Sequence, residues 1–263
     1  MRKRNWFNIV IIFGIASLIV IGLPLLVLPF KHMLQSANGV WLICVQEILT
    51  VGIAFLVNKY YVKQPVFYRF SASIKSLIFV ASPVLIVFFI DILSIGLVSN
   101  LSSKLWGELI MTLISTTLIG ISEEYLFRGL IFPQVLKASG TWTHKDLYAA
   151  ISVSSLLFAC IHVLNLSNQD LTATVIQMIN AFSLGCLFCA LYIRSGSLLL
   201  PIIFHSLWDF NVIELDGIFL APSSIFGTII FNVVVLAITA YDLRNWQLSK
   251  QDNWIEKLAA VKG

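Results

Sequence analysis

Long uninterrupted runs of apolar residues dominate the chain, and the short stretches between them hold most of its charges. A helix that crosses a bilayer needs about 20 mostly apolar residues. The runs are continuous and do not alternate with polar positions, which favours helices over a membrane β-barrel. The pattern predicts eight spanning helices: Phe7–Leu28, Val40–Val57, Leu77–Val98, Leu105–Ile121, Leu147–Leu164, Thr174–Ile193, Leu198–Ile213 and Ser224–Tyr241. The fourth of these helices can continue well beyond Ile121.

The composition excludes the ordinary soluble classes of protein. Of the 263 residues, 59% are hydrophobic and 11% are charged, whereas soluble domains have about 45–50% apolar and about 25% charged residues. The net charge of +4 does not indicate nucleic-acid binding, because the basic residues cluster at helix ends. We therefore expect an all-α polytopic membrane protein in which residues 1–263 form one integral membrane domain. Free cysteines pack as small apolar residues, which is our interpretation of Cys44, Cys160, Cys186 and Cys189.

Lysines and arginines are distributed unevenly over the two sides that eight spans would create. Fifteen of the 17 would lie on one side, which leaves only Lys31 and Lys104 for the other. Loops on the cytoplasmic side of membrane proteins are enriched in these residues. This distribution predicts two cytoplasmic termini. The apolar run that follows Met1–Arg4 is longer than the core of a cleavable signal, so we interpret it as the first helix.

Ionisable side chains at membrane depth are costly and usually functional. Three of them stand apart in the earlier helices, and we interpret them as pore-side, end-cap or partner residues: Glu47, Asp91 and Glu108. The others concentrate in the second half of the chain: Glu123, Glu124, Arg128, His162, Arg194, His205 and Asp209.

Helical spacing assigns different partners to the two adjacent glutamates. Glu124 and Arg128 are four residues apart, so they can form an ion pair within one helix. Glu123 points about 100° away from Glu124 and stays available to a different partner. By the same spacing rule, His205 and Asp209 share one face of the seventh helix.

The fourth and fifth helices should form a hairpin that turns near residues 139–143, where Gly and Thr supply turn and capping chemistry. The midpoint between positions 123 and 162 falls in this turn. Residues equidistant from the turn of an antiparallel pair lie at the same height, so we expect Glu123 to face His162. Each should lie roughly 25–30 Å from the hairpin tip, which therefore projects into the cytoplasm.

A free glutamate, two histidines and an aspartate in a partly dehydrated pocket are typical of water activation. The carboxylate could act as a general base toward water. The histidines could bind a metal such as zinc through their ring nitrogens, or donate to a developing oxyanion. The spacing is not that of the His-Glu-x-x-His zinc motif, and it leaves metal-assisted and metal-free hydrolysis open.

Three segments resemble the motifs of one known family. Glu123-Glu124-Tyr-Leu-Phe-Arg128 resembles the E-E-x-x-x-R motif of CPBP intramembrane proteases, also called the Abi or CAAX-protease-like family. Phe158-Ala-Cys-Ile-His162 is similar to the family's F-x-x-x-H motif. His205-Ser-Leu-Trp-Asp209 is similar to its H-x-x-x-N/D motif. The motifs occur in the family's order, within a family-like core of about residues 105–213.

The resemblance implies an intramembrane endopeptidase, related to the Ras-converting CAAX endopeptidase, with its active site on the fourth, fifth and seventh helices. Glu123 would activate water, supported by Glu124 and Arg128. If a metal is present, zinc is the expected ion, with His162 and His205 as ligands. An ionised Asp cannot donate a hydrogen bond, so Asp209 suits orienting a histidine or completing a metal shell better than donating to an oxyanion. The residues that would position water or metal and stabilise the oxyanion are His162, His205 and Asp209.

Some bacterial members of this family serve in bacteriocin self-immunity or peptide processing. The resemblance therefore implies a bacterial plasma membrane, a peptide substrate in or on the bilayer, possible prenylation of that peptide, and no nucleic acid. Two alternatives stay open. One is a non-catalytic immunity or scaffold protein of the same fold. The other is a proton-coupled transporter with a Glu–His relay, although the paired halves typical of transporters are not evident.

Overall fold

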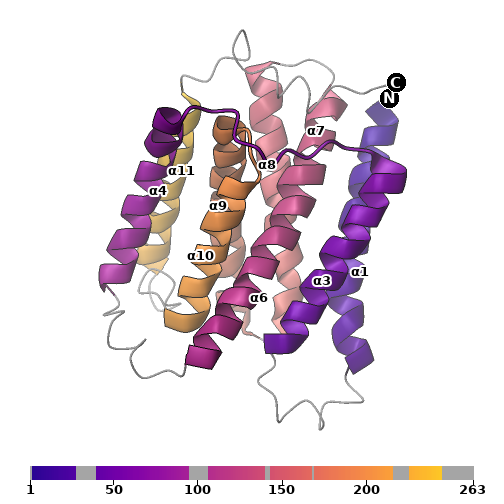
Figure 1. Cartoon of the computed structure of the whole chain (residues 1–263), viewed down its shortest axis with the longest axis horizontal. Coiled ribbons are helices and arrows are strands. Elements are labelled where there is room, and N and C mark those ends of the chain that lie inside the picture. The colour runs from indigo at the N-terminus through magenta and orange to yellow at the C-terminus, as the bar shows by residue number, and fades with distance from the viewer. Residues whose placement is uncertain are drawn as a thin grey trace.

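The computed structural model describes residues 2–27, 40–94, 106–139, 143–167, 169–215 and 225–244. Every regular element in these ranges is helical, and the helices lie side by side in one bundle (Figure 1). The α-helices are α1 (Arg2–Val27), α3 (Val40–Val57), α4 (Ile74–Ser94), α6 (Trp106–Glu124), α7 (Phe132–Ser139), α8 (His144–Ile161), α9 (Leu171–Ser195), α10 (Leu199–Leu215) and α11 (Ile225–Leu243). Three short segments of other helical types extend them: η2 (Asn58–Val62), η3 (Tyr125–Ile131) and η4 (His162–Ser167).

Within the described residues, the helices form eight rods that coincide with the eight predicted spans, and their ends differ from the prediction by a few residues. The fourth span is much longer than its assigned run, because α6 continues through the π-helical segment η3 into α7. Five of the rods are long and apolar enough to cross a membrane, and shorter apolar helices lie within α4 and α10. The predicted all-α polytopic membrane fold is therefore confirmed.

Helix α7 ends at Ser139 and α8 begins at His144, on either side of the position where the sequence predicts a turn. Thr143 caps α8, because its hydroxyl accepts the backbone N–H of Asp146 while the Asp146 carboxylate accepts the backbone N–H of Thr143. This reciprocal pair satisfies two donors that the start of a helix otherwise leaves without partners. The cap fixes the first turn of α8. The length of the helix then determines where its last turn lies along the bundle.

Helix α9 is the centre of the bundle. It packs against α8, α10, α11 and α4, and residues 189–193 are completely buried. The second half of α9 is apolar on most sides, as expected for a buried helical segment. The outer helices instead expose large apolar side chains, as expected where the surroundings are lipid. All four cysteines are free, as predicted.

Helices α6 and α10 approach each other closely at Gly120. A Cβ atom at this position would lie 3.1 Å from the carbonyl oxygen of Ile202, and closer still to the hydroxyl of Ser206. Small residues allow membrane helices to pack backbone against backbone. This close approach brings the last turn of α6 against the middle of α10, where the candidate site lies.

Candidate active site

Glu124 is the centre of a buried chain of charged and polar groups. Its Oε1 atom lies 2.7 Å from Nη1 of Arg128 and 2.7 Å from Nδ1 of His205. The side chains of Glu124 and Arg128 are completely buried, and that of His205 is 5% exposed. The ion pair within the rod is the predicted one. The contact with His205 was not predicted, and it means that Glu124 holds an imidazole as well as a guanidinium.

Aromatic rings surround the guanidinium of Arg128. Its central carbon lies 4.5 Å from the ring centre of Phe158 and 5.4 Å from that of Phe188. A cation over an aromatic face is attracted by the ring quadrupole. Gly185 makes room for the group, because a Cβ atom there would lie 3.0 Å from Nη2 of Arg128. The charge is therefore held by one carboxylate and two rings.

Arg128 lies in a π-helical segment, η3, which the sequence did not predict. The segment closes with the backbone N–H of Phe132 donating to the carbonyl of Phe127, five residues earlier. Ser154 of α8 donates to the same carbonyl at 2.9 Å. Single π turns inside longer helices frequently occur at functional sites. Here the π turn lies directly after the two glutamates.

The second ring nitrogen of His205 faces two carboxylates. Nε2 lies 3.4 Å from Oε2 of Glu123 and 3.5 Å from Oδ2 of Asp209. The side chains of Glu123 and Asp209 are 25% and 22% exposed. Since the Glu124 carboxylate already accepts a bond from Arg128, it must also accept from Nδ1–H of His205. Nε2 is therefore the nitrogen available for chemistry.

His162 reaches the same region from the end of α8. Its Nδ1 atom lies 2.8 Å from the carbonyl oxygen of Phe158. A carbonyl can only accept, so Nδ1 carries a proton and Nε2 of the neutral ring is an acceptor. The Phe158 ring contacts both imidazoles edge-on, with centroids 5.0 Å from that of His162 and 5.7 Å from that of His205. No hydrogen bond joins His162 to Glu123 among the described residues, although both line one cavity.

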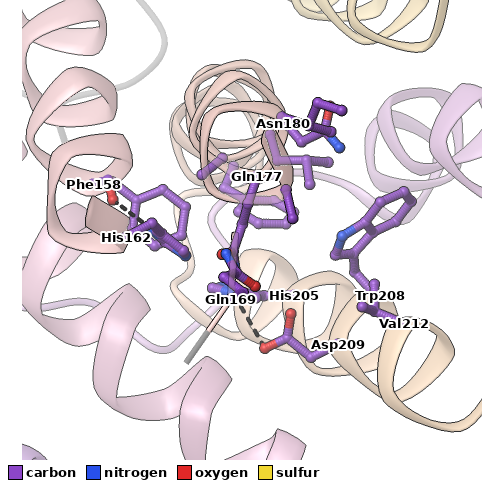
Figure 2. A pocket seen from close by; sticks show the side chains of 14 residues that line it. Phe158, His162, Gln169, Gln177, Asn180, His205, Trp208, Asp209 and Val212 are labelled. Atoms are coloured by element: carbon purple, nitrogen blue, oxygen red, sulfur yellow. Dashed lines mark hydrogen bonds and ion pairs between the residues drawn. The ribbon is translucent and has the colours of Figure 1, made fainter. Parts of the chain in front are cut away.

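Two adjoining cavities, of about 290 Å³ and about 270 Å³, meet at these side chains. Figure 2 shows the first, with His162 on one side and His205, Asp209 and Trp208 on the other. Glu123 lines the second cavity. The residues that line both are His162, Gln177, His205, Asp209 and Val212. The structure thus brings Glu123, His162, His205 and Asp209, from three helical rods, to the walls of these adjoining cavities.

Glu47 of α3 also lines the second cavity, although nothing in its spacing along the chain connects it with the motif residues. It is buried, and it accepts hydrogen bonds from the Ser122 hydroxyl and, at 3.2 Å, from Nε2 of Gln46. Of the three interpretations of Glu47, that of a partner residue agrees best with these contacts, because Ser122 directly precedes Glu123 in the chain. The side chains of Asp91 and Glu108 lie outside the described residues.

The side chains as placed do not provide a zinc centre. The described part of the chain contains no group of three His, Cys, Asp or Glu side chains that could hold a metal ion. Catalytic zinc sites usually have three protein ligands and an open position. With Nδ1 engaged, each of the predicted ligands, His162 and His205, has Nε2 as the nitrogen available to a metal. The mechanism that we propose for these residues therefore uses no metal.

Comparison with known families gives one match. Residues 104–211 match the family described as "Rce1-like: Type II CAAX prenyl endopeptidase Rce1-like". Neither the curated proteins nor the solved structures gave a match. The matched segment runs from the start of α6 into α10 and contains all three motif segments. It confirms the family resemblance and supports a CAAX-type intramembrane protease at the family level.

Proposed function

We propose, from the match of residues 104–211 to the Rce1-like family, that this protein is an endopeptidase in which Glu123 activates water to hydrolyse a peptide bond within the membrane. One observation carries the proposal. His205 is fixed through Nδ1 by Glu124, while its Nε2 lies beside Glu123 and Asp209 at a cavity wall. This arrangement places a general base, the Glu123 carboxylate, next to a hydrogen-bond donor, Nε2–H of His205.

In this mechanism Glu123 accepts a proton from water as the water oxygen bonds to the carbonyl carbon of the substrate. The carbonyl oxygen becomes an oxyanion, and Nε2–H of protonated His205 donates a hydrogen bond to it. The C–N bond then breaks, and the protonated Glu123 returns its proton to the leaving amine. Asp209 lies beside Nε2 and compensates the positive charge of the ring. His162 orients water through its acceptor nitrogen.

The substrate that we propose is a membrane-bound peptide, with a prenylated CAAX-type terminus as the first candidate, since that is the chemistry in the family's name. Peptide processing or bacteriocin self-immunity would use the same hydrolysis. The same proposal has the protein in a bacterial plasma membrane with both termini in the cytoplasm. The excess of Lys and Arg on one predicted side supports that orientation.

The test is a cleavage assay with purified, reconstituted protein and a quenched-fluorescent farnesylated peptide that ends in a CAAX sequence. Wild type should cleave it, and His205→Ala should lower kcat by about 10²-fold or more, the range for losing an oxyanion donor. His144→Ala is the matched control, because His144 is exposed at the start of α8. Cleavage by His205→Ala at the wild-type rate would reject the mechanism. No cleavage by wild type would reject the function on this substrate.

Chelation is expected to leave the activity intact, because the base and the oxyanion donor are both side chains. Purified protein should be dialysed against a strong chelator, assayed, and analysed for bound metal. If chelation abolished the activity and added zinc restored it, the metal-free mechanism would be wrong. His162 and His205 would then be zinc ligands.

A further inference from the structure

Helix α9 presents two side-chain amides to the first cavity, and the mechanism uses neither. Gln177 and Asn180 are three residues apart, so they lie on the same face of α9, about one turn apart. Figure 2 shows Gln177 extending from α9 between His162 and Asp209, with Asn180 above it toward Trp208. Gln177 also lines the second cavity. The two amides therefore lie on the wall that α9 contributes to the first cavity, which His162, His205 and Asp209 also line.

Neighbouring amides engage the oxygen of each. Oε1 of Gln177 accepts hydrogen bonds from Nδ2 of Asn165, at 2.9 Å, and from Nε2 of Gln169, at 2.7 Å. Oδ1 of Asn180 accepts one from Nδ2 of Asn232 of α11, at 2.8 Å. The oxygen end of Asn180 is fixed, because Nδ2 of Asn232 also donates to the carbonyl of Thr228 at 2.7 Å.

The amide nitrogens are therefore the groups that can donate hydrogen bonds to a ligand in the cavity. Among the described residues, neither Nε2 of Gln177 nor Nδ2 of Asn180 has a hydrogen-bond partner. Asn180 is only 5% exposed. Both amides line the first cavity, so a ligand that brings acceptors to this wall can hydrogen-bond to these N–H groups without displacing a protein partner.

We propose that Gln177 and Asn180 bind main-chain carbonyl groups of the substrate peptide, so that the segment entering the site is held along α9 in a non-helical conformation. This inference rests on the proposed function and specifies its substrate. A prenyl chain has no acceptor for an N–H group, whereas a peptide has one at every residue. Within a helix most of those carbonyls are already used by the backbone. The apolar lining, which includes Leu184, Phe188 and Trp208, then receives side chains or the lipid.

The test uses two readouts with the farnesylated CAAX peptide: cleavage kinetics, and equilibrium binding by fluorescence anisotropy. Gln177→Leu and Asn180→Leu should each raise KM and weaken binding by about tenfold, as expected for one hydrogen bond to a neutral partner, with little change in kcat. Gln177→Glu keeps the shape but replaces the N–H donors with an acceptor, and should weaken binding at least as much. Thr172→Val is the control, since Thr172 is exposed on the same helix.

A peptide series separates substrate binding from a structural role. In each peptide one carbonyl outside the scissile bond is replaced by a methylene group. Wild type should lose about tenfold in binding for the peptide that lacks the carbonyl held by Gln177, and Gln177→Leu should show no further loss with that peptide. Equal penalties in wild type and variant at every position would overturn the proposal.

The outcomes also separate this inference from the proposed function. Wild type that binds the peptide without cleaving it would overturn the proposed function alone. Wild type that cleaves, with unchanged KM and binding in Gln177→Leu and Asn180→Leu, would overturn the amide proposal alone. Wild type that does not bind the peptide would overturn both.

Discussion

Glu123→Gln is expected to lower kcat by about 10²- to 10⁴-fold, the usual contribution of a general base, while the protein still folds. The amide has the shape of the carboxylate but cannot accept a proton from water at neutral pH. Oε2 of Glu123 lies 3.4 Å from Nε2 of His205, and the Glu123 side chain is 25% exposed, so the fold should tolerate the change. Cleavage kinetics measure the loss, and thermal unfolding in detergent checks the fold.

Glu47→Gln is the informative comparison for this variant. Glu47 is a second carboxylate on the same cavity, but it accepts hydrogen bonds from Ser122 and Gln46 and is less available to water. Its change should have a smaller effect than that of Glu123→Gln. If Glu47→Gln were inactive and Glu123→Gln active, the general base would have to be reassigned to Glu47.

Arg128→Met is expected to destabilise the protein by about 3–5 kcal/mol, the cost of removing one partner from a buried ion pair. Among the described residues, the change leaves the fully buried Glu124 with His205 as its remaining ion-pair partner. It also removes the cation from between Phe158 and Phe188. Thermal unfolding and yield from membranes measure the loss. Arg128→Lys should recover only part of it, because an ammonium group lacks the planar shape that stacks on rings.

A double variant separates the structural and chemical roles of this pair. Replacing both charges, in Glu124→Leu with Arg128→Met, should recover stability relative to Arg128→Met alone, because neither charge is then buried without a partner. It should not recover activity, since Nδ1 of His205 loses the carboxylate that orients it. Full activity in the double variant would contradict the role that we assign to Glu124.

Contacts within one helix could be predicted from the sequence, whereas contacts between helices could not. The spacing of Glu124 and Arg128 was enough to predict their ion pair, and the apolar runs were enough to locate the helices. The bond between Glu124 and His205 joins residues 81 positions apart, and it depends on how closely α6 and α10 pack. Gly120 lies where α6 and α10 come closest. A single glycine in an apolar run is too common to predict such packing from the sequence.

Glu47 and Gln177 illustrate the same limit for single polar residues. Each is the kind of side chain that membrane helices often use for pairing, and no spacing rule connects either with the motifs. Both became candidates only when α3 and α9 were seen to line the same cavities as His205. The π turn was also missed, because no residue type in Tyr125–Ile131 distinguishes it from a regular helix.

That π turn has a consequence for the architecture of the whole rod. Before it, α6 packs against α10 and α3; after it, α7 packs against α1 and α8. A wider turn changes the rotational phase of a helix without interrupting its hydrogen bonds. The rod can therefore present one stripe to one set of neighbours and a differently oriented stripe to another. A single continuous helix thus packs against two different sets of neighbours, and the glutamates lie where it passes from one set to the other.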